Sequence, residues 1–148
     1  MNYKKIFKYL ICLLPWFIGS ILFRSDTNYY NSLTKPFFAP PSILFPIVWT
    51  ILFILVATSI YNVIDKGDSN YKKYLLINYI SNQLYTFFFF TIKNNFLGLI
   101  DCIIVLISSI YLYKETKNIN ESSSKLLIPY IIWNIFATIL SASILFLN

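Results

Sequence analysis

Long apolar runs separated by short polar breaks make up most of the sequence. Five runs reach or approach the length of about 20 residues that an α-helix needs to cross the hydrocarbon core of a bilayer. They cover residues 6–23, 43–64, 74–92, 96–113 and 126–147. The pattern therefore predicts an all-α membrane protein, in which residues 1–148 form a single domain of five transmembrane helices.

The third run differs from the others because it carries polar side chains along one face. These side chains are Asn78, Ser81, Asn82, Gln83 and Thr86. A polar face within a bilayer is tolerated where it lies against other helices. We therefore keep this run as a span and expect its polar face to point into the bundle.

Lysine and arginine are distributed unevenly between the two sides of the predicted bundle. Nine lie in the N-terminal segment and in the breaks after the second and fourth runs, whereas three lie on the opposite side. Cytoplasmic loops of membrane proteins carry an excess of positive charge. The asymmetry places the N-terminus in the cytoplasm, and an odd number of spans then puts the first loop and the C-terminus outside.

Composition agrees with a membrane protein and excludes several functions. The chain is 57% hydrophobic and 12% charged, with a mean hydropathy of +0.64, whereas a soluble domain carries about twice that charge. It has no histidine, and Cys12 and Cys102 lie within apolar runs, so neither the usual zinc ligand sets nor a disulfide framework is expected. The net charge of +6 comes from residues between apolar runs, which argues against a nucleic-acid partner. Residues for ordinary hydrolysis and a phosphate-binding loop are also missing.

The first loop, residues 24–41, is too long and too rich in proline to be a simple turn. Pro36, Pro40 and Pro41, with Pro46 after them, restrict the backbone and remove hydrogen-bond donors, so the segment is stiff. It is either a lid over the helix bundle or an interfacial loop whose aromatic side chains rest at headgroup level. The sequence alone leaves both possibilities open.

Helical spacing gathers aromatic and polar residues on two faces. On the third run it joins Asn78, Asn82, Tyr85 and Phe89. On the fifth run it joins Tyr130, Trp133, Ala137 and Leu140. Amide and hydroxyl groups at such positions usually bind neighbouring helices. The alternative is that these faces, with Trp49 and Phe53 of the second run, line one cavity for a flat and largely apolar ligand.

Asp101 is the sole carboxylate within a predicted span. A charge in the bilayer costs several kcal/mol unless it is paired, neutralised or close to the surface. Two interpretations of Asp101 are possible. It is either a buried anchor that faces other helices or a bound ligand, or it is a charge near the start of its helix beside Lys93, where the helix dipole stabilises it. We favour the second interpretation, because Asp101 lies only about five residues into the fourth run.

Two motifs extend along the chain from these positions. The first reads Tyr29-Tyr30-Asn31-Ser32-Leu33-Thr34-Lys35-Pro36, followed by Pro40-Pro41, Phe45, Val48 and Trp49. The second reads Pro129-Tyr130, Trp133, Phe136-Ala137 and Leu140. With Asn82 and Asp101 in the runs between them, they resemble the translocator protein family, also called TspO/MBR or tryptophan-rich sensory proteins, whose animal members are peripheral benzodiazepine receptors.

The resemblance implies a five-helix bundle, often a homodimer, with a pocket beneath the first loop. It implies binding of porphyrins such as protoporphyrin IX and of related flat ligands, with no further cofactor. The role would be sensing, sequestration or transport of tetrapyrroles in a bacterial cell membrane. With the spacing above, it assigns these ligand-binding residues: Tyr29, Pro36, Pro40, Pro41, Trp49, Phe53, Asn82, Tyr85, Phe89, Tyr130, Trp133 and Ala137. The structural or ligand-facing polar residues are Asn78, Asp101 and Ser141.

Two other functions stay open. Some bacterial members are similar to light-dependent porphyrin-degrading enzymes, and Trp49 and Trp133 would then be the redox-active side chains. A small efflux transporter is the remaining alternative, in which Asp101 would couple transport to protons.

The chain departs from the family pattern at four polar or aromatic positions. Tyr29 and Tyr85 replace tryptophans, Asn78 replaces a glutamine, and Ser141 replaces an asparagine. We do not carry over the sterol binding of animal members, because no basic residue follows Lys125. One weak match to a proposed sterol motif is formed by Leu106, Tyr111 and Lys114.

Overall fold

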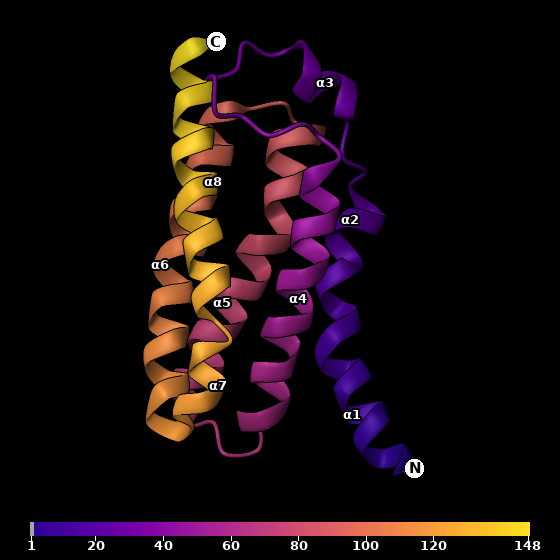
Figure 1. The fold of residues 1–148 in the computed structure, drawn as a ribbon, viewed down its shortest axis with the longest axis vertical. Coiled ribbons are helices and arrows are strands. Elements are labelled where there is room, and N and C mark those ends of the chain that lie inside the picture. The colour runs from indigo at the N-terminus through magenta and orange to yellow at the C-terminus, as the bar shows by residue number, and fades with distance from the viewer. Residues whose placement is uncertain (1) are drawn as a thin grey trace.

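The computed structural model describes residues 2–148, and within this range the chain is helical, without a strand (Figure 1). In chain order the helices are α1 (Tyr3–Leu13), α2 (Ile18–Leu22), α3 (Thr27–Ser32), α4 (Leu44–Val63), α5 (Ser69–Thr86), α6 (Asn95–Ile119), α7 (Glu121–Lys125) and α8 (Ile128–Leu147). A 3₁₀ turn, η1 (Leu14–Phe17), joins α1 to α2, and a π-helical turn, η2 (Phe87–Thr91), extends α5.

Four helical stretches of residues 2–148 are long and apolar enough to cross a membrane. They are Tyr3–Leu22, Leu44–Val63, Asn95–Ile119 and Glu121–Leu147. They correspond to the first, second, fourth and fifth predicted runs. The third run forms α5 and η2, which stand beside these helices but are more polar (Figure 1). The structure confirms an all-α membrane protein, and the fifth span stays a prediction.

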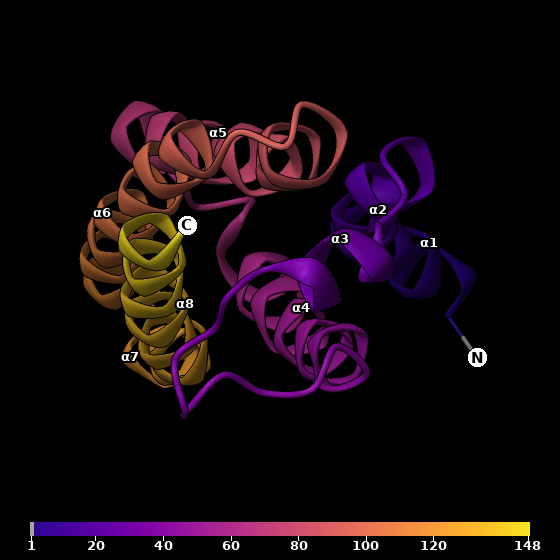
Figure 2. The same cartoon turned by 90° about the horizontal axis from the view of Figure 1, so that it is seen from above.

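The first of these stretches changes its packing partner along its length. α1 packs against α4, whereas α2 packs against α5. α6 packs against both α5 and α8, and α8 also contacts α4. Seen from above, the helices surround the middle of the molecule, and the first loop passes over one side of it (Figure 2).

The break between α1 and α2 explains the polar face of α5. Pro15 cannot donate a backbone hydrogen bond, so the helix tightens there into η1. The Tyr79 hydroxyl donates to the Pro15 carbonyl at 3.0 Å, and Gln83 Nε2 donates to the Trp16 carbonyl at 3.2 Å. The Gly19 N–H in turn donates to Gln83 Oε1 at 2.6 Å. Polar side chains of α5 thus satisfy the backbone groups of the broken helix.

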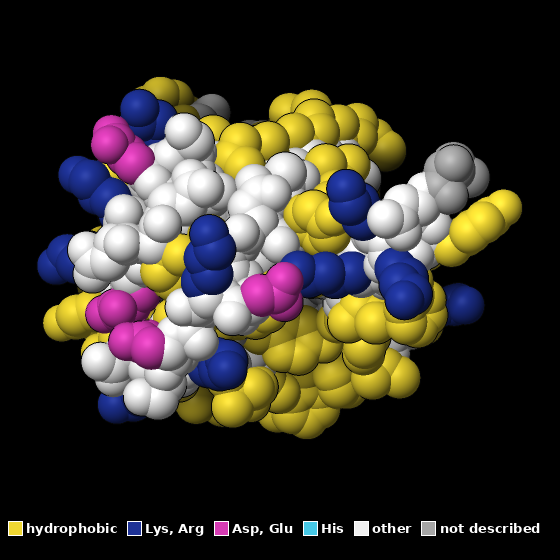
Figure 3. Space-filling view, turned by 90° about the horizontal axis from the view of Figure 1, so that it is seen from below, with side chains coloured by type: hydrophobic (Ala, Val, Ile, Leu, Met, Phe, Trp, Pro, Cys, Tyr) yellow, Lys and Arg dark blue, Asp and Glu magenta, His cyan; other side chains and the backbone are white. Residues whose placement is uncertain are grey.

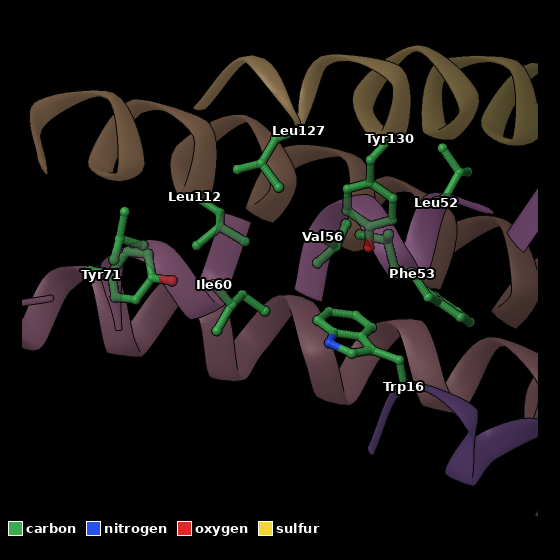
Figure 4. Close-up of a cluster of buried hydrophobic side chains, with 11 residues drawn as sticks. Trp16, Leu52, Phe53, Val56, Ile60, Tyr71, Leu112, Leu127 and Tyr130 are labelled. Carbon is green, nitrogen blue, oxygen red and sulfur yellow. The ribbon is translucent and has the colours of Figure 1, made fainter. Parts of the chain in front are cut away.

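A cluster of buried side chains packs the helices together from this break to the end of the bundle where α5 begins. Its labelled members in Figure 4 are Trp16, Leu52, Phe53, Val56, Ile60, Tyr71, Leu112, Leu127 and Tyr130. Small polar residues let α4 approach α7 closely, since Ser59 Oγ donates to the Ser123 carbonyl at 2.9 Å. In a bilayer such close packing and hydrogen bonding, rather than exclusion of water, hold helices together.

The first loop contains α3 and is held by its own side chains. The carboxylate of Asp26 caps α3 by accepting the Tyr29 N–H at 3.0 Å, and the Tyr30 hydroxyl donates to the Pro40 carbonyl at 2.9 Å. Lys35 Nζ donates to three carbonyls at the C-terminal end of α3, those of Tyr30, Asn31 and Leu33. These bonds order the loop at the end of the bundle where α8 also ends (Figure 1).

Candidate ligand-binding cavity

A cavity of about 440 Å³ lies among η1, α2, α4, α5, η2, α6 and α8, beneath the first loop. Three residues of the first loop contribute to its walls, namely Ser25, Thr27 and Tyr30, and Ser42 and Ile43 directly after the loop also line it. The first loop thus contributes side chains to the cavity wall, as expected of a lid. The walls are mostly apolar and aromatic, which is the usual character of a small-molecule site.

Seven of the predicted ligand-binding residues line this cavity. They are Trp49, Phe53, Asn82, Tyr85, Phe89, Trp133 and Ala137. They come from α4, α5, η2 and α8, so the fold brings together the faces that helical spacing had marked separately. Tyr29, Pro36, Pro40, Pro41 and Tyr130, as well as Asn78, Asp101 and Ser141, lie outside the lining.

Aromatic rings in contact form much of the wall. The ring centroids of Trp49 and Trp133 lie 6.5 Å apart with the rings perpendicular, and Trp49 lies 5.4 Å from Phe53. On the other side, Tyr85 and Phe89 stack at 5.5 Å with an interplanar angle of 10°. Rings that pack edge-to-face and in offset stacks hold one another in place, so the wall offers fixed aromatic surfaces to a flat ligand.

Trp16 is a lining residue that the sequence analysis missed. Its side chain is only 3% exposed, and its ring lies 5.5 Å from Phe53 and 5.3 Å from Tyr79. It points inward because the helix breaks at Pro15, directly before it. A proline followed by an indole inside an apolar run is the signal that could have identified it.

Tyr130 supports the cavity from behind through a buried chain of hydrogen bonds. Asn82 Nδ2 donates to the Tyr130 hydroxyl at 3.1 Å, and this hydroxyl donates to Asn78 Oδ1 at 2.9 Å. Asn78 Nδ2 donates in turn to the Val105 carbonyl at 3.0 Å and to Ser108 Oγ at 2.9 Å. The chain fixes the amide of Asn82 in the wall and ties α5 to α6 and α8.

Tyr29 and Pro40 contribute to the cavity indirectly. The Tyr29 hydroxyl donates to Asn95 Oδ1 at 2.9 Å, and its ring packs at 5.5 Å against the lining residue Phe89. Burial raises the pKa of the Tyr29 hydroxyl above its ordinary value. Pro40 holds Tyr30 through its carbonyl. These residues position the loop rather than form the wall.

The favoured interpretation of Asp101, a charge near the start of its helix beside Lys93, is wrong. Asp101 is only 4% exposed, within α6, and Lys93 instead forms an ion pair with Asp26 of the first loop, with 3.2 Å between Nζ and Oδ2. Within residues 2–148, Asp101 Oδ2 has no hydrogen-bond partner, and the same is true of Ser141 Oγ. Asp101 and Ser141 are both buried among the helices, and neither lines the cavity.

The part of the chain that the structure describes brings no three His, Cys, Asp or Glu side chains together as metal ligands. The side chains that line the cavity are aromatic rings and aliphatic groups, together with amides, hydroxyls and the thiol of Cys102. They can stack on a flat molecule and donate or accept hydrogen bonds at its edge.

Comparison with known proteins finds relatives that cover most or all of the chain. Residues 9–147 match the model of the TspO/MBR family. The chain is 35% identical to the "Tryptophan-rich protein TspO" of Bacillus cereus, over all of this chain and 99% of that protein. It is 40% identical to the "Uncharacterized membrane protein YtaB" of Bacillus subtilis, over 86% of this chain and 84% of that protein. A "Tryptophan-rich sensory protein" of Cereibacter sphaeroides is 25% identical over 93% of this chain.

Proposed function

The chain belongs to the TspO/MBR family, and from this premise we propose that it binds a porphyrin such as protoporphyrin IX in the cavity beneath the first loop. The observation that carries the proposal is that Trp16, Trp49 and Trp133, distant in sequence, all line this cavity. A porphyrin is flat and largely apolar, with polar groups at its edge. Indoles can stack on the macrocycle, while Asn82 meets the edge.

The proposed role is to sense, sequester or transport a tetrapyrrole within the membrane. The protein would span the membrane five times, with α5 and η2 as the third span. Together these elements, of 18 and 5 residues, are long enough to cross a core of about 30 Å. An odd number of spans agrees with Lys-rich breaks at one end and with the first loop and the end of α8 at the other (Figure 1). We propose a bacterial cell membrane, a cytoplasmic N-terminus and a homodimer.

Titration with protoporphyrin IX in the dark tests this function. Purified protein in detergent is expected to give a saturable shift of the porphyrin's Soret band. Replacing both Trp49→Phe and Trp133→Phe is expected to weaken binding roughly tenfold, since each indole contact contributes about 0.5–1.5 kcal/mol. Phe146→Leu is the control, because Phe146 is 86% exposed and outside the cavity. Unsaturable binding, or equal affinity in the double variant and the wild type, would contradict the proposal.

A second candidate function is light-dependent degradation of the bound porphyrin, with dioxygen as the oxidant. The perpendicular contact of Trp49 and Trp133, 6.5 Å between centroids in the cavity wall, favours it because both indoles would adjoin the excited macrocycle. Illumination of the complex should then bleach the Soret band faster than illumination of porphyrin with an unrelated membrane protein. Equal bleaching rates would leave binding as the function and exclude the enzyme.

A further inference from the structure

A stacked pair of tyrosines lies away from the cavity, where α5 begins and α6 approaches its end. The ring centroids of Tyr74 and Tyr111 are 4.8 Å apart, with an angle of 10° between the rings. Tyr111 is 42% exposed, so the pair faces outward. Tyr74 begins the third apolar run, and Tyr111 lies two residues before the end of the fourth, which places both rings at the level of the bilayer surface.

Each ring carries a lysine. Lys73 Nζ lies 5.7 Å from the centroid of Tyr74, and Lys114 Nζ lies 5.3 Å from the centroid of Tyr111. The ion pairs within residues 2–148 are Lys8–Asp65, Lys93–Asp26 and Lys125–Glu121. Within those residues, neither Lys73 nor Lys114 is thus neutralised by a carboxylate. Each ammonium group therefore lies beside one ring of the stacked pair and is available to bind an anion.

Apolar side chains continue the same surface toward the bilayer interior. Ile77 is one turn beyond Tyr74 on α5, and Ile107 is one turn before Tyr111 on α6. They are 37% and 50% exposed; toward the bilayer interior α6 continues into apolar sequence, whereas α5 carries Asn78, Ser81 and Asn82 on its buried face. The surface is thus cationic and aromatic at the membrane surface and aliphatic at the depth of acyl chains.

We propose that this face of α5 and α6 binds one anionic phospholipid. Lys73 and Lys114 pair with the headgroup phosphate, the two tyrosines lie beside the glycerol, and the acyl chains follow Ile77 and Ile107. Basic residues at a membrane surface attract anionic lipids. Figure 3 shows blue basic side chains over this end of the molecule with fewer magenta acidic ones among them, and the lysines in the N-terminal segment and in the breaks after the second and fourth runs outnumber the carboxylates there, so the net field around the pair is positive. The site is separate from the cavity and does not depend on its ligand.

Native mass spectrometry of the full chain in an uncharged detergent tests the proposal. The protein is titrated with phosphatidylglycerol, with phosphatidylcholine and with glycerol phosphate, which lacks acyl chains. The first phosphatidylglycerol is expected to bind roughly tenfold more tightly than phosphatidylcholine, and glycerol phosphate not measurably. In the double variant Lys73→Gln/Lys114→Gln the preference is expected to fall roughly tenfold.

A matched variant separates this site from general electrostatic attraction. Lys66→Gln/Lys117→Gln removes the same charge from the same end, and neither lysine lies over a ring or in an ion pair among residues 2–148. It is expected to keep the preference within about a factor of two. Equal losses in the two variants, no preference in the wild type, or equal binding of glycerol phosphate would each overturn the proposal. Because all four lysines are exposed, unchanged circular dichroism and porphyrin binding are expected in both variants.

Discussion

Asn148 holds Thr34 through two hydrogen bonds that join the end of α8 to the first loop. The Thr34 N–H donates to Asn148 Oδ1 at 2.9 Å, and Asn148 Nδ2 donates to the Thr34 carbonyl at 2.8 Å. The side-chain amide of Asn148 thus bonds both backbone groups of Thr34, as a residue of a neighbouring strand does in an antiparallel sheet. It anchors the proline-rich segment above the cavity from a residue 114 positions away.

Removing this anchor should loosen the lid. In Asn148→Ala the backbone of residues 33–38 is expected to exchange amide hydrogens roughly tenfold faster, since two hydrogen bonds contribute about 1–3 kcal/mol. Hydrogen-exchange mass spectrometry measures this. Asn118→Ala, an exposed asparagine on α6, is the control. Unchanged protection of the loop in Asn148→Ala would show that its other bonds suffice.

Gly19→Ala should destabilise the bundle. A Cβ at Gly19 would lie 2.8 Å from Gln83 Oε1 and 2.9 Å from the Gln83 carbonyl oxygen, too close for either to remain in place. The expected cost is about 1–3 kcal/mol, visible as a lower thermal unfolding midpoint in detergent. Gly98→Ala is the matched control, because its nearest neighbour would be an ordinary contact at 3.4 Å. Equal midpoints for the two variants would contradict close packing of α2 on α5.

Trp16→Phe should weaken porphyrin binding, since it makes smaller the part of the cavity wall that η1 supplies. The expected loss is roughly threefold, at the lower end of the contribution of an aromatic contact. The Soret titration measures it, with Phe146→Leu again as the exposed control. Unchanged affinity with an unchanged unfolding midpoint would place the ligand away from η1.

The ordering of α3 should depend on pH. The Tyr29 N–H, followed by Lys93, lowers the pKa of Asp26 below its ordinary value. A carboxyl whose pKa is lower in the ordered loop stabilises that loop above its ordinary pKa and loses this effect as the pH falls through the lowered value. The amide chemical shift of Tyr29 should therefore change in acid below the ordinary range of aspartate. In Asp26→Asn this step should disappear, and its persistence would assign it to another group.

Asp101→Asn should leave the fold intact or make it more stable. The Asp101 carboxyl is buried within α6 and one oxygen has no partner in the described chain, so a neutral amide of the same size costs less to bury. The unfolding midpoint is expected to stay the same or rise. A separate measurement tests the efflux alternative. If the ligand drives proton movement in proteoliposomes, and Asp101→Asn abolishes this movement, the transporter function is favoured.

Local periodicity accounts for the part of this protein that was predicted correctly. A helix places every third or fourth residue on one face, so Asn82, Tyr85 and Phe89 could be grouped before their partners were known. The length of an apolar run likewise identifies a membrane helix, because each helix must by itself be long enough to cross the hydrocarbon core of the bilayer. The motifs through Trp49 and Trp133 identified the family for the same reason, since they are read along the chain.

Other features depended on contacts between distant segments. Trp16 enters the cavity because Tyr79 and Gln83 compensate for the break at Pro15, and Lys93 lies beside Asp26 rather than Asp101 because the first loop folds over the turn before α6. The sequence by itself determined the membrane helices, their polar faces and the family. The tertiary structure decided which faces meet around the cavity, because buried polar groups must find partners wherever the packing of the helices provides them.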